Sequence, residues 1–417
     1  MDIKITPARL SGIAAAIPSK SAAHRLLILA ALADQPTTLQ LPLASEDIQA
    51  TCSCLEALGA GIRRDGDRVL VTPITTVPSN PLLDCGESGS TLRFLLPVAA
   101  AIVSAARFTG RGRLAERPIA ELKTALAAHG VTFSSEKLPF TVTGRLQPGD
   151  YSVPGNVSSQ YITGLLLAMA AMGGGSSLTL ETDLESAAYV DITLHALQRF
   201  AVEVGKTPAG WSMNGDQALR SPGKLTVDGD WSNAAFFLVA GAIGNLVTVK
   251  GLDLTSTQGD KLILEVLRTF GAGVEASEES VTVSKGPLGG CVVDLREIPD
   301  ALPALAVLAA CAKGETAFIN AGRLRLKESD RLTAVADMIR SLGGKVQELP
   351  EGLIIQGGPL TGGTVNGYGD HRIVMAAAVA ASVCREPVTI TGAEAVRKSY
   401  PNFFEDYSAL GGDIHVL

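Results

Sequence analysis

A lysine, an arginine and two serines stand together near the start of the chain, in the stretch IPSKSAAHRLLILAALA (17–33). The small polar residues precede a run that is apolar on every side, which predicts a buried helix that begins near Ser19. The amino end of a helix carries roughly half a positive charge and unpaired N–H groups. Lys20 and Arg25 add cations to this positive end, so the pattern indicates an anion-binding helix start.

The same arrangement recurs along the chain. Arg93, Arg331 and Arg372 also lie at or near the first turns of predicted apolar helices. One arginine in such a place would be a surface accident, but four in equivalent places indicate a ligand with several negative charges. The chain has no GxxxxGK[ST] and no GxGxxG after a strand, so both nucleotide fingerprints fail.

Six apolar, alanine-rich helices are predicted, and their starts are spaced by roughly 70 residues, as in a repeat protein. They cover residues 19–33, 89–103, 158–172, 231–244, 300–312 and 370–383. A second, amphipathic helix running into a strand keeps the same spacing, as in LEALGAGI and IRSLGGKV. Alternating stretches such as RVLVTP and SVTVSKG supply further strands. We therefore expect six βαβ-type units, three in each of two lobes.

Length and composition agree with two globular domains. The chain has 417 residues, of which 46% are hydrophobic and 18% charged, which suits two cores of ordinary size. We expect a discontinuous first lobe of residues 1–18 and 228–417, and a second lobe of residues 19–227. The formal net charge of -7 and the lack of Lys/Arg runs argue against nucleic acid or an anionic membrane as partner.

The cysteines and the apolar runs indicate in which cellular compartment the protein works. The six cysteines show neither CxxC nor zinc spacing, so we interpret them as buried thiols of a reducing cytoplasm. The longest apolar run, 94–106, is shorter than the about 20 residues of a membrane span. No secretory signal is visible at the amino terminus. We expect a cytoplasmic protein that uses no metal and no cofactor.

Eight short motifs together resemble one family. In order, they are PSKSAAHR, GESGSTLR, ERP, NVSSQY, IPDALP, LKESDRL, GDHR and RKSYP. Each motif is weak alone, but the series covers nearly the whole chain and resembles the 5-enolpyruvylshikimate-3-phosphate synthase family. The resemblance implies a two-lobed, inside-out α/β barrel-like fold of six βαβαββ repeats, with buried central helices and an active site in the interdomain cleft.

The resemblance also implies a reaction and its substrates. The family transfers the enolpyruvyl group of phosphoenolpyruvate to the 5-hydroxyl of shikimate 3-phosphate and releases phosphate, by addition and elimination through a tetrahedral intermediate. The step belongs to the shikimate route to chorismate and the aromatic amino acids. Both substrates are small molecules, and we expect a monomer.

The family's binding residues carry over onto matching positions. For shikimate 3-phosphate they are Lys20, Ser21, Arg25, Ser158, Ser159, Gln160, Ser186, Asp300 and Lys327. For phosphoenolpyruvate they are Lys20, Gly89, Arg117, Gln160, Arg331, Arg372 and Lys398. Without the resemblance, Ser158 and Ser159 would be interpreted as a plain helix cap. Arg117 would equally suit a structural ion pair with Glu116 or Glu121.

The reaction requires two proton transfers. One proton leaves the 5-hydroxyl and another reaches the C3 methylene of phosphoenolpyruvate, which calls for two titratable groups in different environments. Asp300 is our base, and its alternative role is the N-cap of a helix starting at Ala301. Glu328 is our candidate for the methylene proton, with Lys20 as its rival. Positioning and charge stabilisation must supply the rate.

Two residues depart from the family pattern. Glu87 stands where well-known members have asparagine, and its negative charge near a dianion must point away or pair with a cation. Arg323 stands where some members direct an asparagine toward the shikimate hydroxyls, and we leave it out of the site. Neither change removes a catalytic group.

Two other functions fit part of the pattern. The sister enzymes that act on UDP-N-acetylglucosamine usually carry a cysteine before an Arg-Pro in the loop corresponding to GRGRLAERP, and residues 86–290 contain no cysteine. A non-catalytic, two-lobed anion-binding protein would explain the arginines, but it would have no need of Asp300 and Lys327. The shikimate enzyme is therefore favoured.

Overall fold

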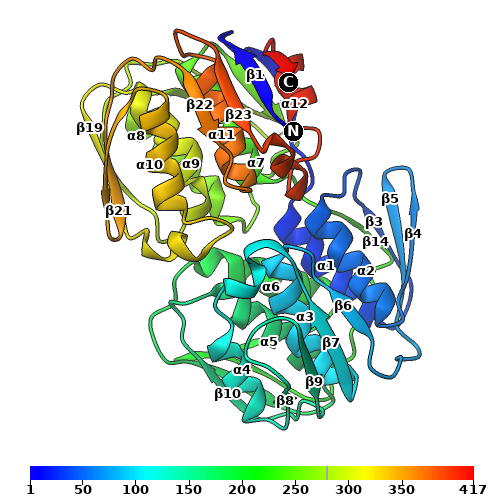
Figure 1. Ribbon diagram of the computed structural model, residues 1–417. Coiled ribbons are helices and arrows are strands. Elements are labelled where there is room, and N and C mark those ends of the chain that lie inside the picture. Colours follow the sequence, from blue (N-terminus) through cyan, green and yellow to red (C-terminus); the bar gives the residue numbers. More distant parts are fainter. Residues whose placement is uncertain (279) are drawn as a thin grey trace. The chain divides into compact units, whose positions relative to one another are not determined.

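The computed structural model describes residues 1–278 and 280–417 (Figure 1). The chain forms two compact units. Unit 1 consists of Met1–Ile17 and Asp228–Leu417, and unit 2 of Pro18–Val227. None of the helices in these described ranges is long and apolar enough to cross a membrane.

Unit 2 holds three four-stranded sheets of one topology. In each sheet the first two strands of the order run parallel and the other neighbours run antiparallel. The orders are β14 (Lys224–Thr226), β3 (Thr37–Gln40), β5 (Arg68–Thr72), β4 (Gly61–Asp65); β6 (Leu82–Asp84), β7 (Ala105–Thr109), β9 (Phe140–Thr143), β8 (Thr132–Phe133); and β10 (Asp150–Val153), β11 (Ser176–Leu180), β13 (Gly210–Met213), β12 (Gly205–Thr207).

Unit 1 repeats this topology three times. The orders, again beginning with the parallel pair, are β2 (Gly12–Ala15), β15 (Val247–Lys250), β17 (Ser280–Ser284), β16 (Gly273–Ala276); β18 (Val292–Asp294), β19 (Glu315–Ile319), β21 (Gly352–Gln356), β20 (Lys345–Leu349); and β22 (Gly363–Asn366), β23 (Val388–Thr391), β1 (Ile3–Thr6), β24 (Asp413–Val416). The amino-terminal strand β1 thus completes the last sheet of the chain. The predicted α/β fold of six repeats is confirmed.

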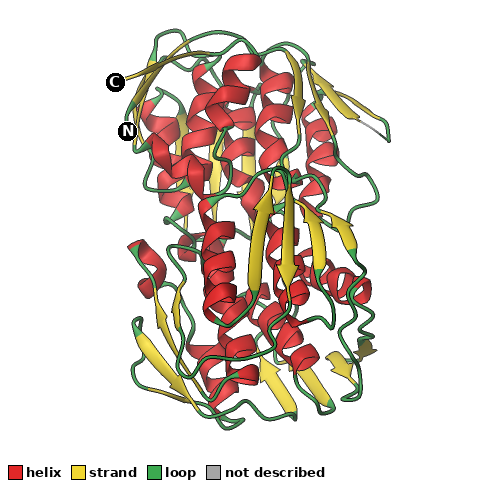
Figure 2. Cartoon of the chain, turned by 90° about the vertical axis from the view of Figure 1, so that its right-hand side faces the viewer, coloured by secondary structure: helices red, strands yellow, loops and turns green. Residues whose placement is uncertain are grey.

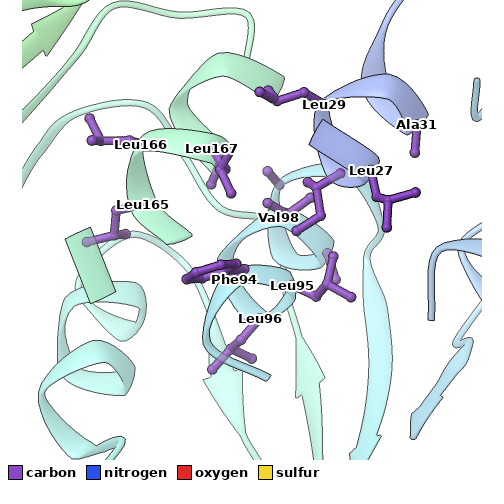
Figure 3. Close-up of a cluster of buried hydrophobic side chains, with 14 of the residues drawn as sticks. Leu27, Leu29, Ala31, Phe94, Leu95, Leu96, Val98, Leu165, Leu166 and Leu167 are labelled. Carbon is purple, nitrogen blue, oxygen red and sulfur yellow. The ribbon is translucent and has the colours of Figure 1, made fainter. Parts of the chain in front are cut away.

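The helices of unit 2 alternate between apolar and amphipathic. They are α1 (Lys20–Leu32), α2 (Glu46–Ala57), α3 (Gly89–Ile102), the 3₁₀ helix η1 (Gly112–Glu116), α4 (Ala120–Ala127), α5 (Ser159–Ala171) and α6 (Ala187–Arg199). The apolar helices α1, α3 and α5 have no wet face, and they are buried over most of their length. Leu27, Leu95 and Leu167 represent the three helices in the shared core (Figure 3).

Unit 1 has the corresponding helices. They are α7 (Trp231–Ile243), η2 (Gly259–Leu262), α8 (Ile263–Phe270), η3 (Pro299–Ala301), α9 (Leu302–Cys311), η4 (Gly322–Leu326), α10 (Arg331–Ser341), α11 (His371–Ala381), η5 (Ala393–Lys398) and α12 (Phe403–Ala409). Every residue of α7 and α11 is buried, and α7, α9 and α11 pack against one another. Figure 2 shows the strands at the outside of the helices in each unit. The expectation of buried central helices is confirmed.

Polar caps fix where the central helices begin. Ser19, Ser88 and Ser158 accept hydrogen bonds from backbone N–H groups of the first turns of α1, α3 and α5. In unit 1, Asp230 and Asp370 do the same for α7 and α11. A capping side chain satisfies one of the unpaired N–H groups of the helix start. The starts therefore lie within a residue or two of those predicted from the sequence.

The contact between α3 and α5 depends on a glycine. A Cβ at Gly164 would lie 2.2 Å from the carbonyl oxygen of Arg93 and 2.9 Å from Cγ of Pro97. Backbone atoms cannot move aside as a flexible side chain can, so Gly164→Ala should lower the free energy of unfolding by about 1–3 kcal/mol. Chemical denaturation measures this quantity.

Gly173, just beyond α5, supplies the matched control. A Cβ there would meet nothing within 4 Å, so Gly173→Ala should change the free energy of unfolding by less than about 0.5 kcal/mol. Equal stability of the two variants would contradict the close approach of α3 and α5.

Candidate active site: two groups of cations at helix starts

The start of α1 carries a lysine that is held by a carboxylate. Nζ of Lys20 lies 2.8 Å from Oδ2 of Asp47, in the first turn of α2. Both side chains are largely buried, with 16% and 13% of their surface exposed. Asp47 fixes the direction of the ammonium group beside Ser21, the next residue of α1. Asp47 is not among the site residues predicted from the sequence, although the acidic start of SEDIQ is a visible helix-start signal.

Arg25 is buried among neutral acceptors. Its guanidinium donates to Oγ1 of Thr193 (2.8 Å) and of Thr163 (3.1 Å), and to the carbonyl oxygens of Ser21 (2.6 Å) and Tyr189 (2.9 Å). Burial lowers the pKa of Arg25 to about 9, so the group stays positive at neutral pH. No carboxylate is among its hydrogen-bond partners in the described part of the chain. A buried guanidinium of this kind gains from a nearby anion.

Ser186 belongs to the same neighbourhood. It directly precedes α6, and its backbone is left-handed with φ 56°, which is strained for a serine. The N–H of Tyr189 donates to the carbonyl oxygen of Ser186 (3.1 Å), and the carbonyl oxygen of Tyr189 accepts from Arg25. The start of α6 and the side chain of Arg25 are thereby linked.

The starts of α3 and α5 are joined through Gln160. Its Oε1 accepts from Nη1 of Arg93 (2.8 Å), and its Nε2 donates to Oγ of Ser90 (2.9 Å). Ser158 accepts from the N–H of Gln160 (3.3 Å), so it is a helix cap in this structure, and Ser159 is the first residue of α5. Arg93 also donates to the carbonyl oxygen of Pro118 (2.8 Å). Arg93 thus ties both helix starts to the loop that carries Arg117.

Arg117 lies directly against Gly89. A Cβ at Gly89 would be 2.6 Å from Nη1, 2.7 Å from Cζ and 2.8 Å from Nη2 of Arg117. The guanidinium therefore stacks on the backbone at the start of α3, where the helix presents its free N–H groups. Of the two acids considered as its partners, Glu116 pairs with Arg113 (3.3 Å) and Glu121 accepts from Tyr161 (3.4 Å).

Glu87 points toward the loop that follows β7. Its Oε2 would lie 2.6 Å from a Cβ at Gly112, a residue whose φ is 57°. A Cβ there would push the carboxylate aside, and the left-handed backbone of Gly112 also favours glycine. The carboxylate of Glu87 and the guanidinium of Arg117 therefore lie against two different glycines of the same neighbourhood.

In unit 1, one carboxylate contacts three cations. Oδ1 of Asp300 lies 2.8 Å from Nη1 of Arg331 and 3.3 Å from Nζ of Lys327, and Oδ2 lies 3.1 Å from Nη2 of Arg372. Asp300 belongs to η3, and the N-cap residue of α9 is Ala301. The carboxylate of Asp300 is thus turned toward cations that come from three other segments of the unit.

Arg331 has two further carboxylate partners. Its Nη2 lies 2.6 Å from Oε2 of Glu328, and its Nε lies 2.8 Å from Oδ2 of Asp370. Ser329 donates to the same oxygen of Asp370 (2.9 Å). Only 2% of the Arg331 side chain is exposed. Its guanidinium is therefore fixed in position by three acidic groups.

Asp370 organises the start of α11. Its Oδ1 accepts from the N–H of Arg372 (3.0 Å), while its Oδ2 accepts from Arg331. Nζ of Lys398 donates to the carbonyl oxygen of Gly369 (2.6 Å), the residue before Asp370. Asp370 was missed by the sequence analysis, although GDHR contains it, because a capping aspartate looks the same whether or not it also holds a distant arginine.

The charges of this group set its protonation state. Burial alone would raise the pKa of Asp300, but Arg372, Lys327 and Arg331 together hold it well below its ordinary value. Burial lowers the pKa of Lys327, and Asp300 opposes that shift. At neutral pH, Asp300 is consequently ionised and able to accept a proton, but the surrounding cations make it a weak base.

The structure thus brings most of the predicted site residues together within their own units. In unit 2, the start of α1 carries Lys20, Ser21 and Arg25. Arg117 lies against Gly89, and Arg93 connects Gln160 to the loop that carries Arg117. In unit 1, one cluster contains Asp300, Lys327, Glu328, Arg331 and Arg372, with Lys398 beside it.

Arg323, which was left out of the predicted site, donates to the carbonyl oxygen of Arg296. Among residues 1–278 and 280–417, no group of three His, Cys, Asp or Glu side chains could hold a metal ion.

Comparisons with known proteins point to one family. The model of the EPSP synthase (3-phosphoshikimate 1-carboxyvinyltransferase) family matches residues 5–407. The 3-phosphoshikimate 1-carboxyvinyltransferase of Clostridium kluyveri is 41% identical over 417 residues, which cover 99% of this chain and 98% of that protein. The enzyme of the same name from Halobacterium salinarum is 40% identical over 428 residues and 99% of both chains.

A solved structure agrees with these relatives. The EPSP synthase of Acinetobacter baumannii superposes with a TM-score of 0.82 at 26% sequence identity, covering 100% of both chains. Fold, sequence and motif order therefore lead to one conclusion, which confirms the resemblance found in the sequence. The chain belongs to the EPSP synthase family.

Proposed function

We propose that this protein transfers the enolpyruvyl group of phosphoenolpyruvate to the 5-hydroxyl of shikimate 3-phosphate and releases inorganic phosphate. The observation that carries the proposal is the contact of the Asp300 carboxylate with Lys327, Arg331 and Arg372. A protein that only binds anions can use carboxylates to hold its cations, but it needs no proton acceptor among them. A proton acceptor beside bound anions, in contrast, is what the transfer requires.

The cations divide between the two substrates according to the family's pattern. We assign shikimate 3-phosphate to Lys20, Ser21, Arg25, Ser158, Ser159, Gln160, Ser186, Asp300 and Lys327, and phosphoenolpyruvate to Lys20, Gly89, Arg117, Gln160, Arg331, Arg372 and Lys398. Arginine suits the second ligand because its planar fork matches carboxylate and phosphate oxygens in pairs. The assigned groups of each substrate come from both units.

Asp300 acts as the base in this mechanism. The 5-hydroxyl oxygen adds to C2 of phosphoenolpyruvate while its proton passes to Asp300, and a proton reaches C3 to complete a tetrahedral adduct. Loss of phosphate then restores the double bond, with a proton leaving C3. The anions of the substrates share Arg331 and Arg372 with Asp300, which weakens the pull of these cations on the carboxylate and makes it a better base.

Glu328 is our candidate for the group that protonates C3. In the structure its Oε2 lies 2.6 Å from Nη2 of Arg331, an assigned phosphoenolpyruvate ligand, so it is close to where that substrate is proposed to bind. Lys20 is the rival donor, held by Asp47. A monomeric state and a cytoplasmic location stay predictions from the sequence.

Phosphate release with two alternative acceptors tests the proposed function. With phosphoenolpyruvate present, shikimate 3-phosphate should stimulate release, and UDP-N-acetylglucosamine should not. Stimulation by UDP-N-acetylglucosamine would assign the chain to the sister reaction. Binding of phosphoenolpyruvate without release in the presence of either acceptor would favour a non-catalytic anion-binding protein.

Replacing the proposed base should abolish most of the turnover. Asp300→Asn keeps the size of the side chain and removes the proton acceptor, so kcat should fall by roughly 10²–10⁴-fold. The KM values should change little, because the cations that bind the anions are retained. Asp294→Asn is the control: Asp294 pairs with Arg296 at the surface of the same unit, and its loss should leave kcat normal. Near-normal turnover of Asp300→Asn would refute the assignment.

Gly89→Ala tests the anion-binding wall at the start of α3. The added methyl group must push the guanidinium of Arg117 away, since it would otherwise lie 2.6–2.8 Å from it. Glyphosate, which competes with phosphoenolpyruvate in this family, is the longer molecule and should lose more, roughly 5- to 150-fold in Ki for about 1–3 kcal/mol. The KM for phosphoenolpyruvate should rise by a smaller factor.

Steady-state inhibition of the wild type, Gly89→Ala and the control Gly173→Ala measures both constants. Equal shifts in Ki and KM would mean that Gly89 shapes the whole site without selecting between the two anions. Unchanged constants in Gly89→Ala would place the glycine outside the site.

A further inference from the structure

A second buried carboxylate lies beside the Asp300 cluster and has no role in the mechanism above. Asp260, in η2, is 3% exposed, and Oγ of Ser232 donates a short hydrogen bond to its Oδ2. Ser232 belongs to the first turn of α7, one residue after Trp231. The backbone carbonyl of Ser232 in turn accepts from Nη1 of Arg372 (3.4 Å). Asp260, Ser232 and Arg372 therefore form a connected series that reaches the site.

Arg372 links this series to the proposed base. Its Nη2 donates to Oδ2 of Asp300 (3.1 Å) and its Nη1 to the carbonyl oxygen of Asp300 (3.3 Å). The charge of Asp260 interacts with Arg372 attractively and with Asp300 repulsively. Asp260 and Asp300 thus both interact with Arg372, and of these two carboxylates only Asp300 belongs to the mechanism.

We propose that Asp260 is a positioning residue for the enolpyruvyl transfer: with Ser232 it holds Arg372 and offsets its charge, so that Asp300 stays basic enough to accept the proton. The proposal rests on the assignment of Asp300 as the base. Ionised Asp260 repels the negative charge of Asp300 and attracts the positive charge of Arg372. Both effects favour proton uptake by Asp300. When Asp260 is protonated, Arg372 acts on Asp300 alone and Asp300 becomes a weaker base.

The titration of Asp260 falls in an accessible range. Burial, together with the charge of Asp300, raises the pKa of Asp260 to about 6, against the opposing effects of Arg372 and the Ser232 hydroxyl. Asp230, the cap of α7, is a further acid that faces it. On η2 itself, Lys261 donates to the carbonyl oxygens of Leu254 (3.0 Å) and Ser256 (2.8 Å), and Glu265 and Arg268 of α8 are exposed. Asp260 is therefore ionised above pH 6 and protonated below it.

Asp260→Asn separates this role from a merely structural one. At about pH 8 the variant should lose roughly 3- to 10-fold in kcat, since a weaker base slows proton transfer. Its KM for phosphoenolpyruvate should change little, because the backbone carbonyl of Ser232, which accepts from Arg372, is retained. The ratio of variant to wild-type kcat, measured at each pH, cancels the titration of the substrates. This ratio should rise toward one as the pH falls through about 6, because the wild type then loses the same charge.

Two further variants complete the test. Ser232→Ala keeps Asp260 but removes the hydroxyl that lowers its pKa, so the acidic loss of kcat should move to higher pH. In an Asp300→Asn background, adding Asp260→Asn should cost less than about twofold in kcat, because the two residues act through one proton transfer.

The outcomes distinguish this inference from the proposed function. A kcat ratio that does not vary with pH, or a full additional loss in the Asp300→Asn background, would overturn the role of Asp260. If Asp260→Asn fails to fold, Ser232→Ala provides the test. An acidic loss of kcat at the same pH as in the wild type would then overturn the role of Asp260. Normal turnover by Asp300→Asn alone would instead refute the base, and absence of phosphate release by the wild type would refute the proposed function.

Discussion

The sharing of one carboxylate by three cations governs the site of unit 1. Arg331 and Arg372 are almost wholly buried, and a buried guanidinium needs acceptors for its N–H groups, which carboxylates supply here. Asp300 contacts both arginines and Lys327 with just two oxygen atoms, which is why its pKa lies so far below the ordinary value. Glu328 and Asp370 supply further negative charge to Arg331, but the three cations that contact Asp300 still restrain it as a base.

The fold supplies this arrangement through its repeats. Three apolar helices in each unit have to be buried together, so their starts become neighbours. In unit 1 this places Asp300 before α9 and Arg372 at the start of α11, while α7 contributes Ser232 to their support. Unit 2 solves the same problem with neutral groups, since threonine hydroxyls and backbone carbonyls hold Arg25. The buried arginines of the two units therefore lie in different surroundings, neutral around Arg25 and acidic around Arg331.

Much of the fold could be predicted from the sequence, and less of the site. Helices that are apolar on every side can be recognised in the sequence as buried helices. Their serine and aspartate caps mark the starts to within a residue or two. The partners of the site residues carry no such signal. Asp47 meets Lys20 across 27 residues, and Asp370 meets Arg331 across 39. Asp260 lies in a stretch, QGD, that has no local feature beyond a turn. Which acid holds which cation depends on how repeats pack, and no periodicity records it.

The central claim is that the cations at the helix starts bind the substrates' anions while Asp300 faces the attacking hydroxyl. A crystal structure with shikimate 3-phosphate and an unreactive mimic of phosphoenolpyruvate tests it most directly. The claim predicts that Arg117, Arg331 and Arg372 donate to the mimic, that Lys20 and Arg25 lie at shikimate 3-phosphate, and that a carboxylate oxygen of Asp300 lies within hydrogen-bond distance of the 5-hydroxyl. Anions bound away from these cations, or an Asp300 carboxylate that faces only protein groups, would contradict it.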